Sequence, residues 1–490
     1  MISILNSLAY GAIGLLVYSS LLVIYRLCFS PIAQIPGSKL AAATSAPYNK
    51  LTKWNDRFGI PLSTHGTAQH ELHHKRRMAI NPYFSKKSIN ELVPQIQDRM
   101  TTLLNHLRKD YEDKDKVLSL TDMWASFAAE NIFAYTFAWS YNFLDSLDEK
   151  NPFLESNREL AQTVHVTGHY PQFLKFMQSI PESWVAVLNP SMKAIFDFQN
   201  GIVAQIVRMK KGKNETLNKS ENRTVFHDIL ESDLLPPEEK SITRMQQEAT
   251  AICVAAIGTI STSLSHACFE ILRNPTIKSR LEKELQDSFP DHSRAPTLSE
   301  LERLPYLTAV IQETDTTMIA LRASIGVAQR LSHVQPTPIT YGIYTIPANT
   351  PIGMNIYNQH YDPRIFPDPN NFQPDRWLGD PKVPVPKDSS AQAEKGGEQE
   401  EKTRQSPLSR FLVPFSKGPR NCLGQFLAHA ELYIGLASLF RSSAGKVMRL
   451  YETEEKDIFM AREYFVPLPV RGANGVRVKI GEKHGEEEIS

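Results

Sequence analysis

The sequence predicts a mainly α-helical protein with minor β structure, attached to a membrane by a single N-terminal helix. The first observation is an uncharged apolar stretch at the N-terminus. The second is a long stretch predicted to be helical, residues 241–273, which follows prolines 236–237 and ends at Asn274-Pro275. Its middle is apolar nearly all round, so it should run through the core. The third is that short β-type runs appear late, at residues 338–346 and 466–480.

Composition and charge exclude several classes of protein. The chain has 490 residues, of which 41% are hydrophobic and 22% charged. This usage is typical of a globular protein and excludes a wholly disordered chain or a polytopic membrane protein. The net charge is only +1, so no basic field indicates binding to nucleic acid. Four cysteines are too few for a disulfide scaffold in so long a chain, which favours a reducing compartment.

The N-terminal stretch has the length and composition of a membrane span. No charged side chain precedes Arg26, and about 20 helical residues suffice to cross a bilayer. We expect residues 1–29 to be a retained anchor and residues 30–490 the functional domain; a cleaved signal or a buried helix is the alternative. Arg26 and Lys39 follow the span, so the domain should face the cytosol. Residues 380–405 have almost nothing to bury and predict a disordered loop.

One cysteine lies in a distinctive frame. Cys422 is preceded by Phe415, Gly418 and Arg420 and followed by Gly424, and a helical run begins next. Free N–H groups and the helix dipole at such a helix start favour a thiolate, which is the iron ligand of haem proteins that cleave the O–O bond. The glycines let the backbone approach a flat macrocycle, and the arginine suits a propionate. A cysteine that is simply a small buried hydrophobic residue is the alternative.

These residues resemble the haem-binding loop of the cytochrome P450 superfamily, in the style of its microsomal, fungal secondary-metabolism members. Residues 371–377, which read NFQPDRW, and residues 344–351 before them are similar to two further family segments. The run 70–77 resembles the helix that meets a haem propionate, with His73 where the family has tryptophan and Arg77 at the usual arginine. A solvated basic helix face is the alternative for these two residues.

The resemblance implies the cytochrome P450 fold, a cofactor and a reaction. The sulfur of Cys422 would ligate the iron of a haem. The protein would use O2 and electrons from NADPH–cytochrome P450 reductase to hydroxylate or epoxidise a small apolar substrate, in the biosynthesis of a secondary metabolite. The implied location is the endoplasmic reticulum membrane, with a single pass and a cytosolic catalytic domain.

The central helix departs from the family pattern, because the acidic residue of the motif Ala/Gly-Gly-x-Asp/Glu-Thr is missing. Two registers compete for the hydroxyl position. Matching Gly258 to the motif glycine selects Ser261 with Thr262, and this register is preferred; counting back from the end of the helix selects Thr259. The two are not equivalent, because Thr259 and Ser261 lie about 200° apart around a helix. Small residues that merely let helices pack are the alternative.

A second departure affects the Glu-x-x-Arg motif of the family. Glu313 matches its glutamate, but residues 315–320 (DTTMIA) stand between it and Arg322. The extra helical residues rotate Arg322 by about 600° and move it roughly 9 Å, so it could not pair with Glu313 on one helix. We expect the buried arrangement of Glu313 and Arg322 with Arg376 to lose its geometry, at a considerable cost in stability.

The third departure is a short N-terminal region. Only 25 residues lie between Thr44 and His70, so the N-terminal β-lobe of the family is expected to be largely truncated. Such defects would arise from a decaying gene or a faulty gene model, and they support the alternative of a haem-binding or degraded relative without turnover. A further alternative keeps the fold but uses peroxide, because the acid of the central helix is missing.

Overall fold

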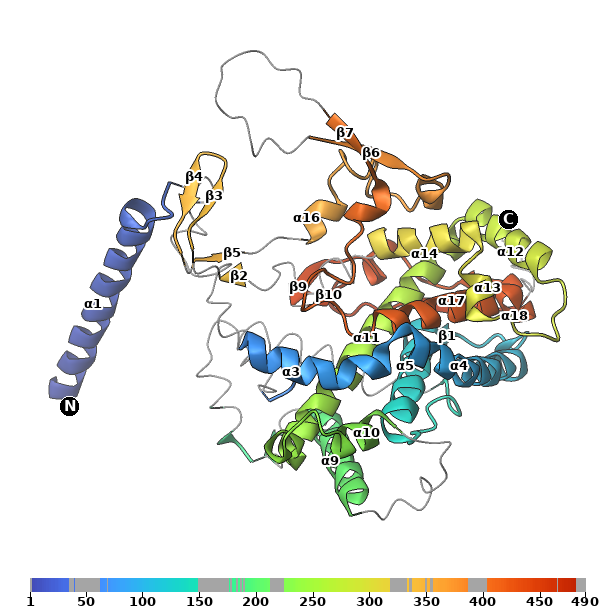
Figure 1. Ribbon diagram of the computed structural model, residues 1–490, viewed down its shortest axis with the longest axis horizontal. Coiled ribbons are helices and arrows are strands. Elements are labelled where there is room, and N and C mark those ends of the chain that lie inside the picture. Colours follow the sequence, from blue (N-terminus) through green and yellow to red (C-terminus); the bar gives the residue numbers. More distant parts are fainter. Residues whose placement is uncertain are drawn as a thin grey trace.

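The computed structural model has a helical body and an N-terminal helix that extends away from it (Figure 1). Helices dominate the described residues and the strands are short, as the sequence predicts. The structure describes residues 2–34, 39, 62–67, 69–148, 176, 179–181, 184–185, 187, 190–211, 224–317, 333–334, 337–348, 350–352, 356–386, 403–464 and 466–481.

The N-terminal helix α1 runs over Ile2–Ile24 and continues as one π turn, η1 (Tyr25–Phe29). The apolar stretch Ala9–Phe29 is long enough to cross a membrane, and the protein buries none of its most apolar window. Leu15 and Leu16 are among its exposed side chains. So much exposed apolar surface is unfavourable in water, which makes α1 a candidate membrane anchor.

The body is built around α11 (Ile242–Arg273), whose bounds agree with the predicted central helix. Ser241 begins the helix by accepting the N–H of Arg244, and Asn274 ends it and caps the next helix. Although α11 is also long and apolar enough to cross a membrane, most of its apolar window is buried, so it is a core helix. The helices packed on α11 include α5 (Leu120–Phe137), α9 (Pro190–Lys210), α12 (Pro275–Ser288), α14 (Pro305–Thr317) and α17 (Gln425–Arg441).

A glycine lets α17 lie close to the two central helices. A Cβ atom on Gly435 would stand 3.2 Å from Leu264 of α11 and 3.3 Å from Trp124 of α5, so a larger residue would push α17 away. The remaining helical segments are α3 (His70–Ile80), η3 (Asn81–Phe84), α4 (Lys86–His106), η4 (Leu107–Tyr111), α10 (Val225–Glu231), η6 (Pro237–Lys240), α13 (Leu298–Leu301), α16 (Ile356–His360), η7 (Pro374–Trp377), η8 (Leu408–Phe411), α18 (Ser443–Lys446) and η9 (Glu455–Asp457).

The described strands form one antiparallel sheet of three strands and four two-stranded ladders. The larger sheet has the order β1-β11-β8, and Val478 of its central strand lies between Leu118 and Leu450. The late β-type runs are confirmed, because β3, β4, β10 and β11 fall within them. The strands are β1 (Leu118–Ser119), β2 (His333–Val334), β3 (Ile339–Tyr341), β4 (Tyr344–Ile346), β5 (Pro351–Ile352), β6 (Lys382–Pro386), β7 (Thr403–Pro407), β8 (Met448–Leu450), β9 (Arg462–Tyr464), β10 (Val466–Leu468) and β11 (Arg477–Ile480).

Two expectations about irregular regions have different outcomes. The loop predicted over 380–405 was too wide, because β6 and β7 pair as antiparallel strands at its edges. Val383 of β6 is buried in a small cluster with Leu408 and Trp377, so this edge does bury side chains. Residues 387–402 in its middle lie outside the described residues. Residues 40–61 also lie outside them, so the truncated β-lobe stays a prediction.

Candidate haem site and active site

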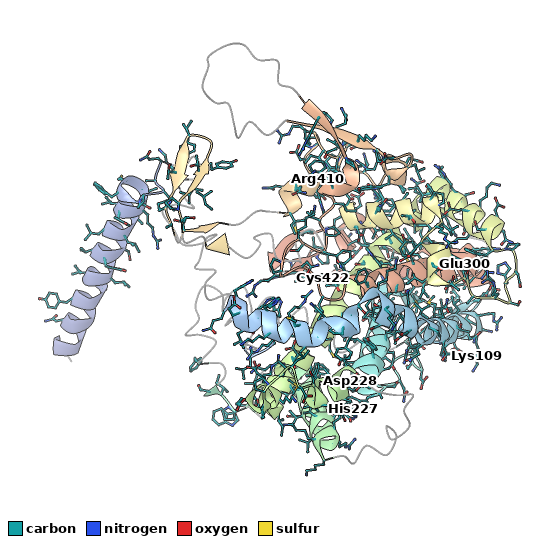
Figure 2. All side chains as sticks on the ribbon, viewed as in Figure 1. Lys109, His227, Asp228, Glu300, Arg410 and Cys422 are labelled. Atoms are coloured by element: carbon teal, nitrogen blue, oxygen red, sulfur yellow. The ribbon has the colours of Figure 1, made fainter. Side chains whose placement is uncertain are left out.

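The cysteine loop connects η8 to the start of α17, and Figure 2 shows Cys422 within the helical body beside α3. The backbone N–H of Cys422 donates to the carbonyl oxygen of Phe415 at 2.8 Å, and Asn421 donates to Gly418 at 3.0 Å. Gly418 has a positive φ of 84°, a conformation that favours glycine. These bonds close the predicted frame into a compact loop, with the cysteine half-buried.

The expectation that the helix start favours a thiolate is only partly met. Burial raises the pKa of the Cys422 thiol, while the backbone N–H of Gly424 and the charge of Arg77 act in the opposite direction. The effect of lost solvation on the thiol pKa is larger than the opposing effect of the N–H groups at the start of the helix, because a buried thiolate needs more compensating charge than N–H groups supply. A metal cation would supply that charge, since a thiol that coordinates a metal is deprotonated.

Basic side chains gather beside the loop and define what we call the basic cluster: His65, His73, Arg77 and Arg420. Arg77 of α3 donates to the carbonyl oxygen of Asn421 at 3.0 Å, directly before the cysteine. Burial and the neighbouring charge of Arg420 lower the pKa of His73 to about 4, and the charge of Arg420 also acts to lower the pKa of His65, whose side chain is exposed. His73 is therefore neutral, and an anion bound here would compensate the charges of the two guanidinium groups.

The basic cluster fits the carboxylates of a haem. The ring of His73 is buried, and its Nδ1 atom has no hydrogen-bond partner among the described residues. A buried polar atom without a partner is costly, and a ligand would remove that cost. Sequence reasoning found His73, Arg77 and Arg420 through the family resemblance. It missed His65, which belongs to no motif and reaches the cluster only through the fold.

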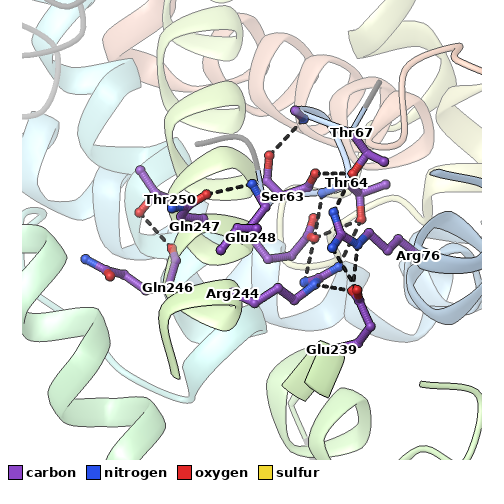
Figure 3. A network of polar contacts seen from close by, with 12 residues as sticks. Ser63, Thr64, Thr67, Arg76, Glu239, Arg244, Gln246, Gln247, Glu248 and Thr250 are labelled. Carbon is purple, nitrogen blue, oxygen red and sulfur yellow. Dashed lines mark hydrogen bonds and ion pairs between the residues drawn. The ribbon is translucent and has the colours of Figure 1, made fainter. Parts of the chain in front are cut away.

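A buried network holds in place the turn that carries His65 (Figure 3). The backbone N–H and the hydroxyl of Thr64 both donate to Glu248 of α11, at 2.9 and 2.8 Å. Arg76 of α3 donates to both oxygens of Glu239 at 2.6 and 2.8 Å, and to the Thr67 hydroxyl at 2.6 Å. The same turn holds the cysteine loop, because Arg420 donates to the Thr67 carbonyl at 2.8 Å. The centre of this network, which extends further in Figure 3, is formed by Thr64, Thr67, Arg76, Glu239, Arg244 and Glu248.

The hydroxyl candidates of α11 point in different directions. Ser261 is fully buried and donates to the carbonyl oxygen of Thr121 in α5 at 2.6 Å, so it faces the neighbouring helix. Thr259 and Thr262 are only half-buried and share a side of α11 with the exposed Ala255. Each donates to the carbonyl oxygen four residues earlier, at 2.7 and 2.8 Å. The structure thus brings Thr259 and Thr262 together on the open side of α11 and leaves Ser261 on the packed side.

The ion pair that the sequence put in doubt is present. Glu313 of α14 is completely buried, and its Oε2 atom lies 3.1 Å from Nε of Arg376. Glu313 also accepts the indole N–H of Trp377 at 2.8 Å and the backbone N–H of Gln373 at 2.9 Å. The expected loss of geometry is therefore wrong for Glu313 and Arg376, while Arg322 lies outside the described residues.

The fold and the cysteine loop define a helical protein with a candidate haem-thiolate site. A family model for cytochrome P450 matches residues 49–464. The chain is 34% identical to a cytochrome P450 monooxygenase of Eupenicillium brefeldianum, over 97% of this chain and 98% of that protein. It is 31% identical to a tryptophan 6-hydroxylase of Fusarium equiseti, over 94% of each chain. A crystal structure of a cytochrome P450 superposes with a TM-score of 0.61 at 16% identity, over 88% of this chain and 84% of that one.

The chain therefore belongs to the cytochrome P450 family of haem-thiolate monooxygenases. Its relatives named above are fungal enzymes, which agrees with the fungal style of the sequence motifs. Enzymes of this family need a redox partner and O2.

Proposed function

We propose that this chain binds haem through the sulfur of Cys422 and inserts one atom of O2 into a small apolar substrate. The other oxygen atom leaves as water, which takes two electrons and two protons, and the electrons come from NADPH–cytochrome P450 reductase. The observation that carries the proposal is the closed loop that presents Cys422 beside the basic cluster. The fungal relatives support a role in secondary metabolism.

Different side chains would hold the iron and the carboxylates of a bound haem. Bound haem would supply O2 activation and electron storage, chemistry that the protein's own side chains lack. Cys422 would hold the iron, and Arg77, Arg420 and His73 would hold the carboxylates and so fix the orientation of the ring. The retained pair of Glu313 and Arg376 supports the catalytic alternative over a degraded relative.

Proton delivery would depend on hydroxyls and water, because the open side of α11 carries threonines where the family has an acid beside a hydroxyl. Thr259 and Thr262 each have their hydrogen engaged by the helix backbone, which leaves oxygen lone pairs free to hold a water molecule. We therefore assign the distal hydroxyl role to these two residues rather than to Ser261.

The cysteine assignment is tested by the absorption spectrum of the reduced protein under carbon monoxide. We expect wild type to show the Soret band of thiolate-ligated haem and Cys422→Ala to lose it. Cys28→Ser is the matched control, because Cys28 is an exposed cysteine at the end of the anchor, and it should keep the band. A Cys422→Ala protein that keeps the thiolate band would overturn the assignment. Turnover with reductase and NADPH, compared with peroxide alone, tests the electron source.

The membrane topology is tested separately. We propose that α1 spans the endoplasmic reticulum membrane once and that residues 30–490 form a cytosolic catalytic domain, because Arg26 follows the span. Carbonate extraction of microsomes should leave the full chain in the membrane, and added protease should digest the domain without detergent. Protection of the domain from protease would contradict this orientation.

A further inference from the structure

A buried acid on α14 lies against a histidine of α17. The side chain of Asp315 is 3% exposed, and its Oδ2 atom lies 3.5 Å from Nε2 of His429 on α17. Its other oxygen has no hydrogen-bond partner among the described residues. Burial raises the pKa of Asp315, and His429 opposes that shift. A buried carboxyl with so little support is costly, so His429 is held toward Asp315.

The histidine connects this acid to the cysteine loop. The ring of His429 meets the ring of Phe415 edge to face, with centroids 4.8 Å apart and planes at 90°. The carbonyl oxygen of Phe415 accepts the N–H of Cys422 at 2.8 Å. A continuous series of contacts therefore runs from Asp315 through His429 and Phe415 to Cys422.

The acid does not come from the family pattern. Asp315 opens the stretch 315–320 that separates Glu313 from Arg322 in this sequence. It nevertheless lies within the helix, two residues after Glu313 and therefore about 200° around it. Glu313 faces η7 and Asp315 faces α17, so the same turn of α14 supports both segments.

We propose that His429, held by Asp315, is a positioning residue of the cysteine loop: it keeps Phe415 in place, and Phe415 in turn fixes the backbone of Cys422. The proposal rests on the haem ligation proposed above. Loss of the histidine ring frees Phe415 to move, the hydrogen bond to Cys422 weakens, and the sulfur leaves the iron more readily. His429 touches neither substrate nor iron in this role and acts only through Phe415.

The outer side of His429 has room for substitutions. It borders a pocket of about 80 Å³ together with Lys86 and Glu302, which form an ion pair at 2.9 Å. The side chain of His429 is 38% exposed, so phenylalanine can take its place without a clash in the core. Phenylalanine keeps an aromatic edge against Phe415 and removes the bond to Asp315, whereas alanine removes both.

The test measures how fast the reduced, carbon monoxide-bound holoenzyme loses its thiolate Soret band on mild warming. We expect His429→Ala to lose the band about two- to tenfold faster than wild type, as for the loss of one aromatic pair. His429→Phe should lose the band at a rate between those of wild type and His429→Ala, because its ring keeps the contact with Phe415 but is no longer held by Asp315. His106→Ala is the control, because His106 pairs with Asp110 at 3.0 Å at the far end of α4, roughly 30 Å along that helix from Lys86.

The role of Asp315 is tested with Asp315→Leu. This variant removes a buried acid, so its global unfolding by far-UV circular dichroism should occur at the wild-type temperature or above it. It should nevertheless lose the thiolate band faster, and Asp315→Leu with His429→Ala should be no faster than His429→Ala alone. If Asp315 had only a structural role, the unfolding temperature and the rate of loss of the thiolate band would change together.

Three outcomes overturn the proposal. The first is a wild-type rate in His429→Ala, and the second is a multiplication of the two single effects in the double variant. The third is a wild-type protein with haem but no thiolate band, which refutes the proposed function as well. The first two leave that function intact, so the two failures are distinguishable.

Discussion

Glu313 offers the sharpest test of the energetics of the fold. It is completely buried and accepts two N–H groups, from Trp377 and Gln373, besides its ion pair with Arg376. Replacement by alanine would leave the Arg376 side chain, which is 8% exposed, without its counter-charge. Removing one partner of a buried ion pair costs about 3–5 kcal/mol. We therefore expect Glu313→Ala to lower the free energy of unfolding by about 3–5 kcal/mol.

The measurement is urea unfolding of the detergent-solubilised protein, followed by circular dichroism and compared at equal m values. Glu313→Gln should lose less than Glu313→Ala, because the amide oxygen still accepts one N–H group. Glu302→Ala is the matched control, since Glu302 pairs with Lys86 at 2.9 Å on the surface, and exposed pairs contribute about 0–1 kcal/mol. If Glu313→Ala costs no more than Glu302→Ala, the reasoning about buried charge at this site is refuted.

Two further predictions concern α11 and α17. Thr259→Val and Thr262→Val should each lower the product formed per NADPH consumed, whereas Ser261→Ala should leave that ratio unchanged and cost about 1 kcal/mol of stability through its lost bond to α5. An unchanged ratio of product to NADPH in both threonine variants would contradict the distal hydroxyl role assigned to Thr259 and Thr262. Burial raises the pKa of the Glu431 carboxyl from 4.5 to about 8, so the folded state binds the carboxyl proton more tightly than the unfolded state does. The free energy of unfolding should therefore fall as the pH rises between these two values, by at most about 1.4 kcal/mol per pH unit. Glu431→Gln should remove that fall, as urea midpoints at pH 5 and pH 8 would reveal; an equal fall in both proteins would argue against it.

The helical body and the cysteine frame were readable from the sequence because local patterns specify them. The ends of α11 carry strong signals, since Ser241 caps its start and Asn274 is followed by a proline. The frame around Cys422 was visible because glycine and arginine at fixed spacing are needed for one loop conformation.

The fate of Glu313 was mispredicted because the inserted residues come after it along the chain. Arg376 comes from η7, a different segment, so its approach to Glu313 does not depend on the residues beyond the end of α14. Sequence spacing describes partners on one helix and says little about partners that the fold brings together.

The direction of the serine and threonines could not be read from the sequence. Apolar and small residues surround the middle of α11 on nearly every side, so periodicity did not distinguish its packed side from its open side there. The contact between Ser261 and Thr121 depends on where α5 crosses, which is a tertiary property. The same holds for His65 and His429, which have no motif and gain significance only from their neighbours.

The back-bonded threonines of α11 set a condition on any proton relay along this helix. While the hydroxyl hydrogens of Thr259 and Thr262 point at backbone carbonyls, the side chains can accept a hydrogen bond from water but cannot donate one to it. To pass a proton on, each must first release its carbonyl, and the stiffness of a β-branched side chain about χ1 resists that rotation. Serine, which is not β-branched, would make that rotation more easily than threonine at either position.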